Sequence, residues 1–362
     1  MTVASEGVAA KKVVRMGVIG AGNFASRRHI PDILKCPEAR LEAFCRRDPE
    51  ARARLAAFFH LPPERAYADW RQMLEEVPLD AVVIATPHAL HYEQAKAALE
   101  RGLHVLVEKP MAVRAVEAQE LNALAEAKGL KLAVALNPPH WAHCHQIRRA
   151  LHDERMGELE AASLFWCSSA EPLFGKAPLP ENLPGVVPPS LFRADPNLTG
   201  GGYFIDGGSH LVSELLWTTG RRVKRVTAVA DNYPSDMRIS VSLELDNAAF
   251  ANITTIGDSK FVNRRLRHIF ACTGGTVTVN HWEFETSITL HEQQVRRFKE
   301  ADMLPVEGPV ANFVSAILGY GSLYSPGTHG ADVVEVVEAV YRSLQTGKSI
   351  TLPLTNAAEV SG

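Results

Sequence analysis

The sequence predicts an α/β fold with two parts: an N-terminal doubly wound parallel sheet and a C-terminal α/β domain with an open, mostly antiparallel sheet. Between residues 13 and 135, short apolar runs alternate with helical patterns, which is typical of parallel β-α-β units. The pattern changes at Asn137-Pro138-Pro139, after which alternating segments follow one another closely. The chain of 362 residues is long enough for two domains at roughly 150 residues each.

The first part contains alternating candidate strands and helices. We expect strands at 13–19, 41–45, 81–85, 104–107 and 131–135, and helices at 23–35, 49–59, 88–101 and 113–128. Gly102 and Gly129 follow the last two helices, where a left-handed C-cap is expected. Five parallel strands with crossover helices form a sheet that binds ligands beyond the carboxyl ends of its strands. We place this domain at residues 11–137.

The second part, residues 138–355, begins with a candidate helix at 141–151 and a strand at 158–168. A loop with seven prolines, residues 172–196, follows, and loops of this length are usually functional. We then expect a helix at 203–218, strands at 223–230, 239–245, 248–255, 266–272, 276–279 and 284–291, a closing helix at 331–345 and a last strand at 349–352.

Composition excludes several classes of protein. A net charge of −3 gives no basic field for nucleic acid or an anionic membrane surface. The five cysteines form no C-x-x-C pair, which argues against a secreted disulfide framework. The N-terminus lacks the apolar run of a signal peptide. The longest uncharged stretch, 308–331, contains two prolines and five glycines and is no membrane span. We expect a cytoplasmic protein with a small-molecule partner.

A glycine-rich turn directly follows the first strand. It reads Gly20-Ala21-Gly22-Asn23-Phe24-Ala25, with Asn23 and Phe24 at the start of the first helix. Gly20 permits the tight turn, Gly22 lets the backbone approach a pyrophosphate, and Ala25 lets the helix pack on the strand. The alternative is a tight turn without a ligand. In this β-α-β context the pattern predicts dinucleotide binding.

The tip of the second strand indicates which dinucleotide is bound. Arg46 and Arg47 stand where an acidic residue would accept hydrogen bonds from the ribose of NAD. Guanidinium groups hold a 2'-phosphate that a carboxylate would repel. We therefore predict NADP in preference to NAD. Alternatively, both arginines are solvated surface charges and Asp48 contacts the ribose.

Three further motifs make the chain similar to a known family. Thr86-Pro87-His88 with His91 follows the third strand, Glu108-Lys109-Pro110 follows the fourth, and Gly200 to His210 reads GGGYFIDGGSH. Together they resemble the glucose-fructose oxidoreductase, inositol dehydrogenase and MocA (Gfo/Idh/MocA) family of NAD(P)-dependent oxidoreductases. The resemblance implies a Rossmann domain followed by an α/β domain that often builds dimers or tetramers. It places Thr86, Pro87, His88, His91, Glu108 and Lys109 at the cofactor.

The resemblance also assigns Lys109, Asp206 and His210 to catalysis. Asp206 and His210 are four residues apart, so on a helix they project from one face. Gly207 and Gly208 between them each cost a helix roughly 1 kcal/mol relative to alanine, which suggests that something needs close access there. The resemblance further implies a cis peptide bond before Pro110. Separately, Lys109 could be a surface lysine and His210 a core histidine.

Two residues depart from the family pattern: His88, where Asn is frequent, and His140, where Arg is frequent. His140, His143 and Cys144 have a spacing that could place three metal ligands on one helical face. A fourth ligand is not evident, and a structural site normally needs four, so we expect no metal.

These observations predict an oxidoreductase that transfers a hydride between NADP(H) or NAD(H) and a hydroxyl or carbonyl carbon of a sugar, cyclitol or related polyol. His210 would act as general base, Asp206 would hold its ring, and Lys109 would stabilise the developing alkoxide. Two alternatives stay open: an NAD-dependent glycosidase that acts by transient oxidation and elimination, and a non-catalytic nucleotide-sensing regulator.

Overall fold

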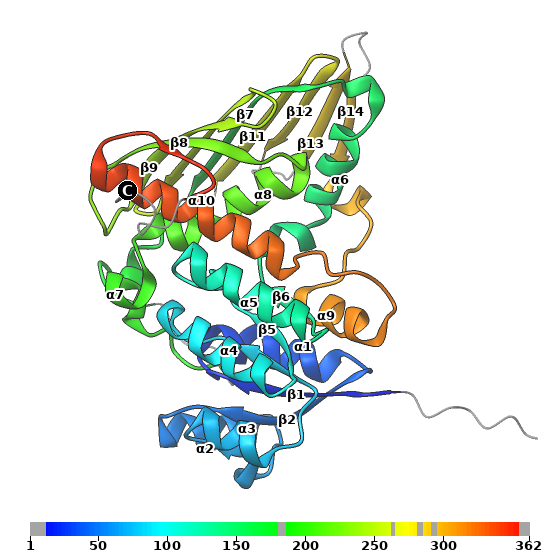
Figure 1. Cartoon of the computed structure of the whole chain (residues 1–362), viewed down its shortest axis with the longest axis vertical. Helices are drawn as coiled ribbons and strands as arrows, with labels where there is room; N and C mark the ends of the chain where they lie inside the picture. Colours follow the sequence, from blue (N-terminus) through cyan, green and yellow to red (C-terminus); the bar gives the residue numbers. More distant parts are fainter. Residues whose placement is uncertain (1–11, 180–185, 262–264, 281–284, 291–294, 355–362) are drawn as a thin grey trace, which may run out of the picture.

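The computed structural model describes residues 12–179, 186–261, 265–280, 285–290 and 295–354. Figure 1 shows a parallel sheet in the lower half of the molecule and a larger sheet at the top, with helices between them. The predicted outer domain limits, residues 11 and 355, and the predicted strand ends at 284 and 291 lie outside the described residues.

The first sheet has six parallel strands in the order β3-β2-β1-β4-β5-β6. They are β1 (Val14–Ile19), β2 (Ala39–Cys45), β3 (Ala66–Tyr67), β4 (Ala81–Ile84), β5 (His104–Val107) and β6 (Leu132–Val134). The strand order reverses between β1 and β4, and ligands bind beyond the carboxyl ends at such a reversal. The sequence predicts five of these strands; it misses β3, which has only two residues.

Helices connect these strands and cover both faces of the sheet. They are a π-helical turn (Ala25–His29) that continues into α1 (Ile30–Lys35), then α2 (Pro49–Phe58), α3 (Trp70–Glu76), α4 (His91–Glu100) and α5 (Ala115–Ala127). The predicted helix at 23–35 is therefore wound more widely in its first half. The helix α3 was not predicted.

The second sheet has nine strands in the order β14-β13-β12-β11-β7-β10-β9-β8-β15. Among the strand pairs that the structure describes in this sheet, only β7 and β10 run in parallel. The strands are β7 (Leu159–Cys167), β8 (Val223–Ala230), β9 (Arg238–Leu245), β10 (Phe250–Ile256), β11 (Arg265–Cys272), β12 (Gly275–Asn280), β13 (Glu285–Leu290), β14 (Val295–Lys299) and β15 (Ile350–Thr351). The edge strand β14 was not predicted. The predicted fold class is confirmed.

Three helices pack on the inner face of this sheet: α6 (Ala142–Leu151), α8 (Ser209–Thr219) and α10 (Gly327–Thr346). In Figure 1 they lie between the two sheets. The helix α10 also contacts α5 and β6, so one buried apolar cluster contains both Val134 of the first sheet and Leu164 of the second. The apolar core thus continues across the predicted boundary at residue 137, and the division into 11–137 and 138–355 stays a prediction.

An additional helix, α9 (Pro309–Leu318), returns to the first sheet. Its residues Val310, Phe313 and Val314 are buried in one cluster with Val18 and Val83. A short helix, α7 (Pro196–Thr199), ends the proline-rich loop. Among the described residues, no helix combines the length and the apolar character needed to span a membrane.

Candidate active site

The glycine turn has the geometry expected of a phosphate cradle. Gly20 has a φ of +87°, and a Cβ there would lie 2.6 Å from Thr86 Cγ2 and 2.8 Å from the Ala85 backbone. At Gly22 a Cβ would make ordinary van der Waals contacts, 3.8 Å from Arg46 Nη1 and from the Gly20 carbonyl oxygen. The chain enters its helix at Asn23 and presents free N–H groups at that end. These residues therefore fit a dinucleotide pyrophosphate.

The proline-rich loop lies against this cradle. Asn23 donates from Nδ2 to the carbonyl of Val187 at 2.7 Å, and the N–H of Val187 donates to Ser26 Oγ at 3.0 Å. Phe24 packs against the edge of His29, with the ring centroids 5.4 Å apart. Two cradle residues thus hold the loop through its Val187 backbone.

At the tip of β2 the structure separates the two arginines. Arg46 is partly buried beside Gly22; its Nη1 donates to the Ala21 carbonyl at 3.4 Å, and its Nε has no hydrogen-bond partner within the described residues. Burial lowers the pKa of Arg46. Arg47 is exposed. Asp48, the alternative ribose ligand, caps α2: one of its two carboxylate oxygens accepts a hydrogen bond from the N–H of Ala51 at 2.6 Å.

The loop after β4 is braced to the turn after β5. Thr86 donates from Oγ1 to Gln94 at 2.7 Å, and Pro87 precedes a short 3-10 helix. The ring nitrogens of fully buried His91 lie 2.8 Å from the carbonyl oxygens of Thr86 and Pro110. The Lys109–Pro110 peptide bond is cis, as the resemblance implies. His91 thus ties the two loops together and keeps neither ring nitrogen for a ligand.

His88 and Glu108 lie on either side of this braced turn. The Nδ1 of His88 lies 3.2 Å from the Thr199 carbonyl, and burial lowers the pKa of His88 well below its usual value. Glu108 pairs with His29 Nε2 at 2.7 Å. Burial alone would raise the pKa of Glu108, but the hydrogen bond and charge of His29 lower it.

Lys109 reaches from the first domain into the helix that carries His210. Its Nζ donates to both the carbonyl oxygen and Oδ1 of Asp206, each at 2.7 Å. The other carboxylate oxygen lies 3.1 Å from Nε of Arg193. Burial would raise the pKa of Asp206, but Arg193 and Lys109 hold it well below its usual range. Both oxygens of the Asp206 carboxylate therefore contact cations, Lys109 and Arg193, and the expected role of Asp206 in holding the His210 ring stays a prediction.

His210 lies one turn further along, at the start of α8, in an aromatic setting. Its ring stacks on Trp166 with centroids 5.7 Å apart, and the Trp141 ring lies at 6.1 Å. A Cβ on Gly207 or Gly208 would lie 2.7 Å from the Tyr203 ring or 2.2 Å from the Phe204 ring, respectively. These glycines are therefore needed for aromatic packing inside a second π-helical turn, Phe204–Gly208, which continues into α8.

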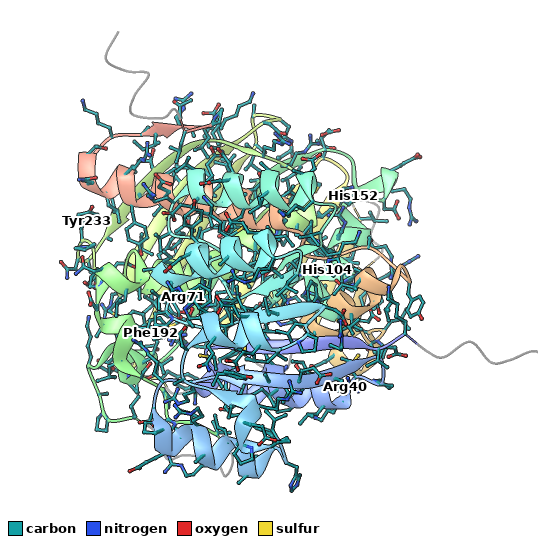
Figure 2. The ribbon with its side chains drawn as sticks, turned by 60° about the horizontal axis from the view of Figure 1, so that its bottom comes forward. Arg40, Arg71, His104, His152, Phe192 and Tyr233 are labelled. Carbon is teal, nitrogen blue, oxygen red and sulfur yellow. The ribbon has the colours of Figure 1, made fainter. Side chains whose placement is uncertain are left out.

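The proline-rich loop supplies site residues that the sequence did not identify. Phe192 lies edge-on to His88 with centroids 5.3 Å apart, and Arg193 stacks on Phe192 while it pairs with Asp206. In Figure 2, Phe192 lies on the green segment at the left edge of the molecule. The sequence predicted a functional role for this loop but named no residue in it, because the path of an irregular loop depends on tertiary contacts.

A cavity of about 650 Å³ lies beside the turn after β6. It is lined by Asn137, His140 and Trp141 together with residues of α1 and α9.

The three candidate metal ligands do not all meet. His140 turns away, with its Nδ1 2.9 Å from the Glu307 carbonyl. His143 and Cys144 are buried, and Glu214 of α8 joins them. No sequence pattern indicated Glu214, because it reaches His143 and Cys144 through the packing of α8 on α6.

The fold and the cradle define a dinucleotide-binding protein, and comparisons with known proteins agree. The model of the GFO_IDH_MocA oxidoreductase family, an NAD-binding Rossmann fold, matches residues 14–136, and the GFO/IDH/MocA C-terminal domain model matches residues 144–278. The chain belongs to the GFO/IDH/MocA family. This confirms the predicted family, whose N-terminal model is that of an NAD-binding Rossmann fold.

Individual relatives act on different sugars. The chain is 35% identical over 150 residues (41% of this chain, 45% of the relative) to dTDP-3,4-didehydro-2,6-dideoxy-alpha-D-glucose 3-reductase of Streptomyces antibioticus. It is 31% identical over 245 residues (67% and 69%) to D-xylose 1-dehydrogenase (NADP(+)) 2 of Haloferax volcanii. The match thus spans less than half of the first relative. An inositol dehydrogenase homolog complexed with NAD+ from Azotobacter vinelandii shares the fold, with a TM-score of 0.81, 19% identity and coverage of 97% of this chain and 100% of that one.

Proposed function

We propose that the protein is an NADP(H)- or NAD(H)-dependent dehydrogenase or reductase that acts on a hydroxyl or carbonyl carbon of a sugar, cyclitol or related polyol. The observation that carries the proposal is the amine of Lys109, held by Asp206 at the start of the helix that bears His210. The names of the sugar-specific relatives support the substrate class.

Each residue of this group has a definite task. The bound dinucleotide supplies a nicotinamide that accepts or donates a hydride. An ammonium has three N–H donors, and Lys109 gives two of them to Asp206, so one is left for the substrate oxygen. There it stabilises the developing alkoxide, while His210 accepts the hydroxyl proton in the oxidation direction.

Arg193 and Asp206 act on Lys109 rather than on the substrate. With its carboxylate kept ionised between two cations, Asp206 fixes the position of the lysine amine at all ordinary pH values.

The pyrophosphate of the dinucleotide would be held by the glycine turn and the adjoining helix end, at Gly20, Gly22 and Asn23.

We further propose that NADP is the preferred cofactor, because Arg46 lies beside the cradle with a buried Nε that no described residue bonds. The family resemblance supports a homodimer or homotetramer, and the absence of C-x-x-C pairs supports a cytoplasmic location.

A spectrophotometric screen of sugars, inositols and sugar acids with NADP and NAD tests the proposal. Net change in nicotinamide absorbance is expected with at least one substrate. Lys109→Ala and His210→Ala should each lower kcat by about 10²-fold or more and leave cofactor affinity nearly unchanged. Lys128→Ala, which removes an exposed lysine from the end of α5, is the matched control.

Two outcomes contradict the proposal. Sugar release without net absorbance change indicates the glycosidase, and cofactor binding without turnover of any substrate indicates the regulator. Unchanged turnover in both variants refutes the residue assignment even if the enzyme class holds.

A further inference from the structure

Behind the catalytic helix, α6 and α8 bring together three side chains that commonly bind transition metals. A ring nitrogen of His143, Sγ of Cys144 and a carboxylate oxygen of Glu214 all lie within 4.8 Å of one another. All three residues are buried, with exposures of 8%, 0% and 0%. The proposed reaction uses none of them.

The carboxylate in this cluster is incompletely satisfied. Glu214 Oε1 lies 2.6 Å from Nδ1 of His268, a fully buried residue of β11. The second oxygen, Oε2, is buried and has no hydrogen-bond partner among the residues that the structure describes. An unpaired carboxylate oxygen in an apolar interior is costly, and a cation beside it removes that cost.

We propose that His143, Cys144 and Glu214 bind a zinc ion, with His268 holding the Glu214 carboxylate in place. A thiolate, a carboxylate and a neutral imidazole around Zn²⁺ sum to zero charge, which suits a buried site. The thiol proton of Cys144 is released to solvent when the metal binds. Mixed sulfur and nitrogen ligands favour zinc over magnesium or calcium.

The geometry permits this coordination with small movements. With bonds of about 2.3 Å to sulfur and about 2.0 Å to nitrogen and oxygen, tetrahedral ligand atoms lie roughly 3.3–3.6 Å apart. The three ligand atoms lie at most 4.8 Å apart. Side-chain rotations that move each atom by about 1 Å bring them to the tetrahedral separations. A water molecule fills the fourth position. The contact between His268 and Glu214 is the kind of outer hydrogen bond that orients carboxylate ligands.

The ion would join the helix that follows Trp141 to the helix that carries His210. Glu214 lies one turn after His210 on α8, and His143 stacks on Trp141, which itself faces His210. Zinc would therefore fix α6 against α8 and position the aromatic surroundings of His210, without touching the substrate.

The test measures metal content, which does not depend on knowing the substrate. Tag-free full-length protein is equilibrated with excess zinc, desalted and analysed by inductively coupled plasma mass spectrometry. We expect about one zinc ion per chain, and less than about 0.2 in Cys144→Ser and in Glu214→Gln. Cys272→Ser replaces another buried cysteine, at the end of β11, and should retain the wild-type content.

Cobalt provides a second readout on the unmodified protein. Co²⁺ bound by Cys144 should give a thiolate-to-cobalt charge-transfer band that Cys144→Ser removes and Cys272→Ser retains. A wild-type protein that holds no zinc after equilibration, or variants that hold as much as the wild type, would overturn the proposal. Because metal content is measured directly, failure here leaves the proposed dehydrogenase function untouched.

Discussion

Replacement of Arg46 by alanine should change which dinucleotide the protein prefers. Arg46 is the arginine that lies beside the cradle, 3.4 Å from the Ala21 carbonyl, with an Nε that no described residue bonds. A 2'-phosphate would supply acceptors for this guanidinium, whereas the 2'-hydroxyl of NAD carries no charge to pair with it.

The size of the effect follows from one lost charge-assisted hydrogen bond. Such a bond contributes about 1.5–3 kcal/mol, which corresponds to about 10- to 150-fold in Kd. Arg46 is only partly buried, and solvent screening weakens exposed ion pairs, so we expect about 10- to 30-fold weaker NADP binding. The Kd for NAD should change by less than about 3-fold, since no charged contact is lost.

Fluorescence titration of NADPH and NADH measures both affinities without a substrate. Arg54→Ala is the matched control, because it removes the same charge from an exposed position of the neighbouring α2. Equal weakening for both dinucleotides, or tighter binding of NADH than NADPH by the wild type, would refute the assignment of Arg46 to the 2'-phosphate.

Two further predictions concern stability. Burial raises the pKa of Asp236 from 3.8 to about 6, and a raised folded-state pKa means that stability is present at low pH and lost as the pH rises. The free energy of unfolding of the wild type, compared with that of Asp236→Asn, should therefore fall by about 3 kcal/mol between pH 3.5 and pH 7. Urea titrations at both pH values measure this difference. A difference that does not change with pH contradicts the prediction. Gly208→Ala places a Cβ against the Phe204 ring and should destabilise by about 1–3 kcal/mol. Gly321→Ala adds a Cβ in open space outside the helices and should change stability by less than about 0.5 kcal/mol. Equal effects of the two substitutions would show that the aromatic packing tolerates the methyl group.

The sequence predicts the elements whose pattern arises from local burial. The strand at 223–230 has the predicted bounds as β8, because the second sheet buries one face and exposes the other. Elements without that alternation were missed. The edge strand β14 is almost fully exposed and carries Arg296 and Arg297. The helix α9 has no charged residue and only Asn312 and Ser315 as polar ones, so no charged face marks it.

For the site, the sequence could predict residues held close to strand ends but not those delivered by tertiary contacts. Lys109 lies two residues after β5, and Asp206 and His210 lie four residues apart in one helical segment, so motif order was enough to single them out as candidates. The contact of Asp206 with Arg193 was not predicted, because the position of Arg193 depends on a loop of irregular path. Likewise, Glu214 meets His143 and Cys144 only because α8 packs on α6.

The last part of the proline-rich loop contacts two groups that lie far apart in the sequence. The Val187 backbone forms hydrogen bonds with the side chains of Asn23 and Ser26 at the start of the first helix, and six residues later Arg193 pairs with Asp206. The same Asp206 carboxylate accepts a hydrogen bond from Lys109. Residues 187 to 193 therefore contact both the turn after β1 and the carboxylate that Lys109 bonds, and no local sequence pattern could have placed them there, because each of these contacts joins segments distant in the chain.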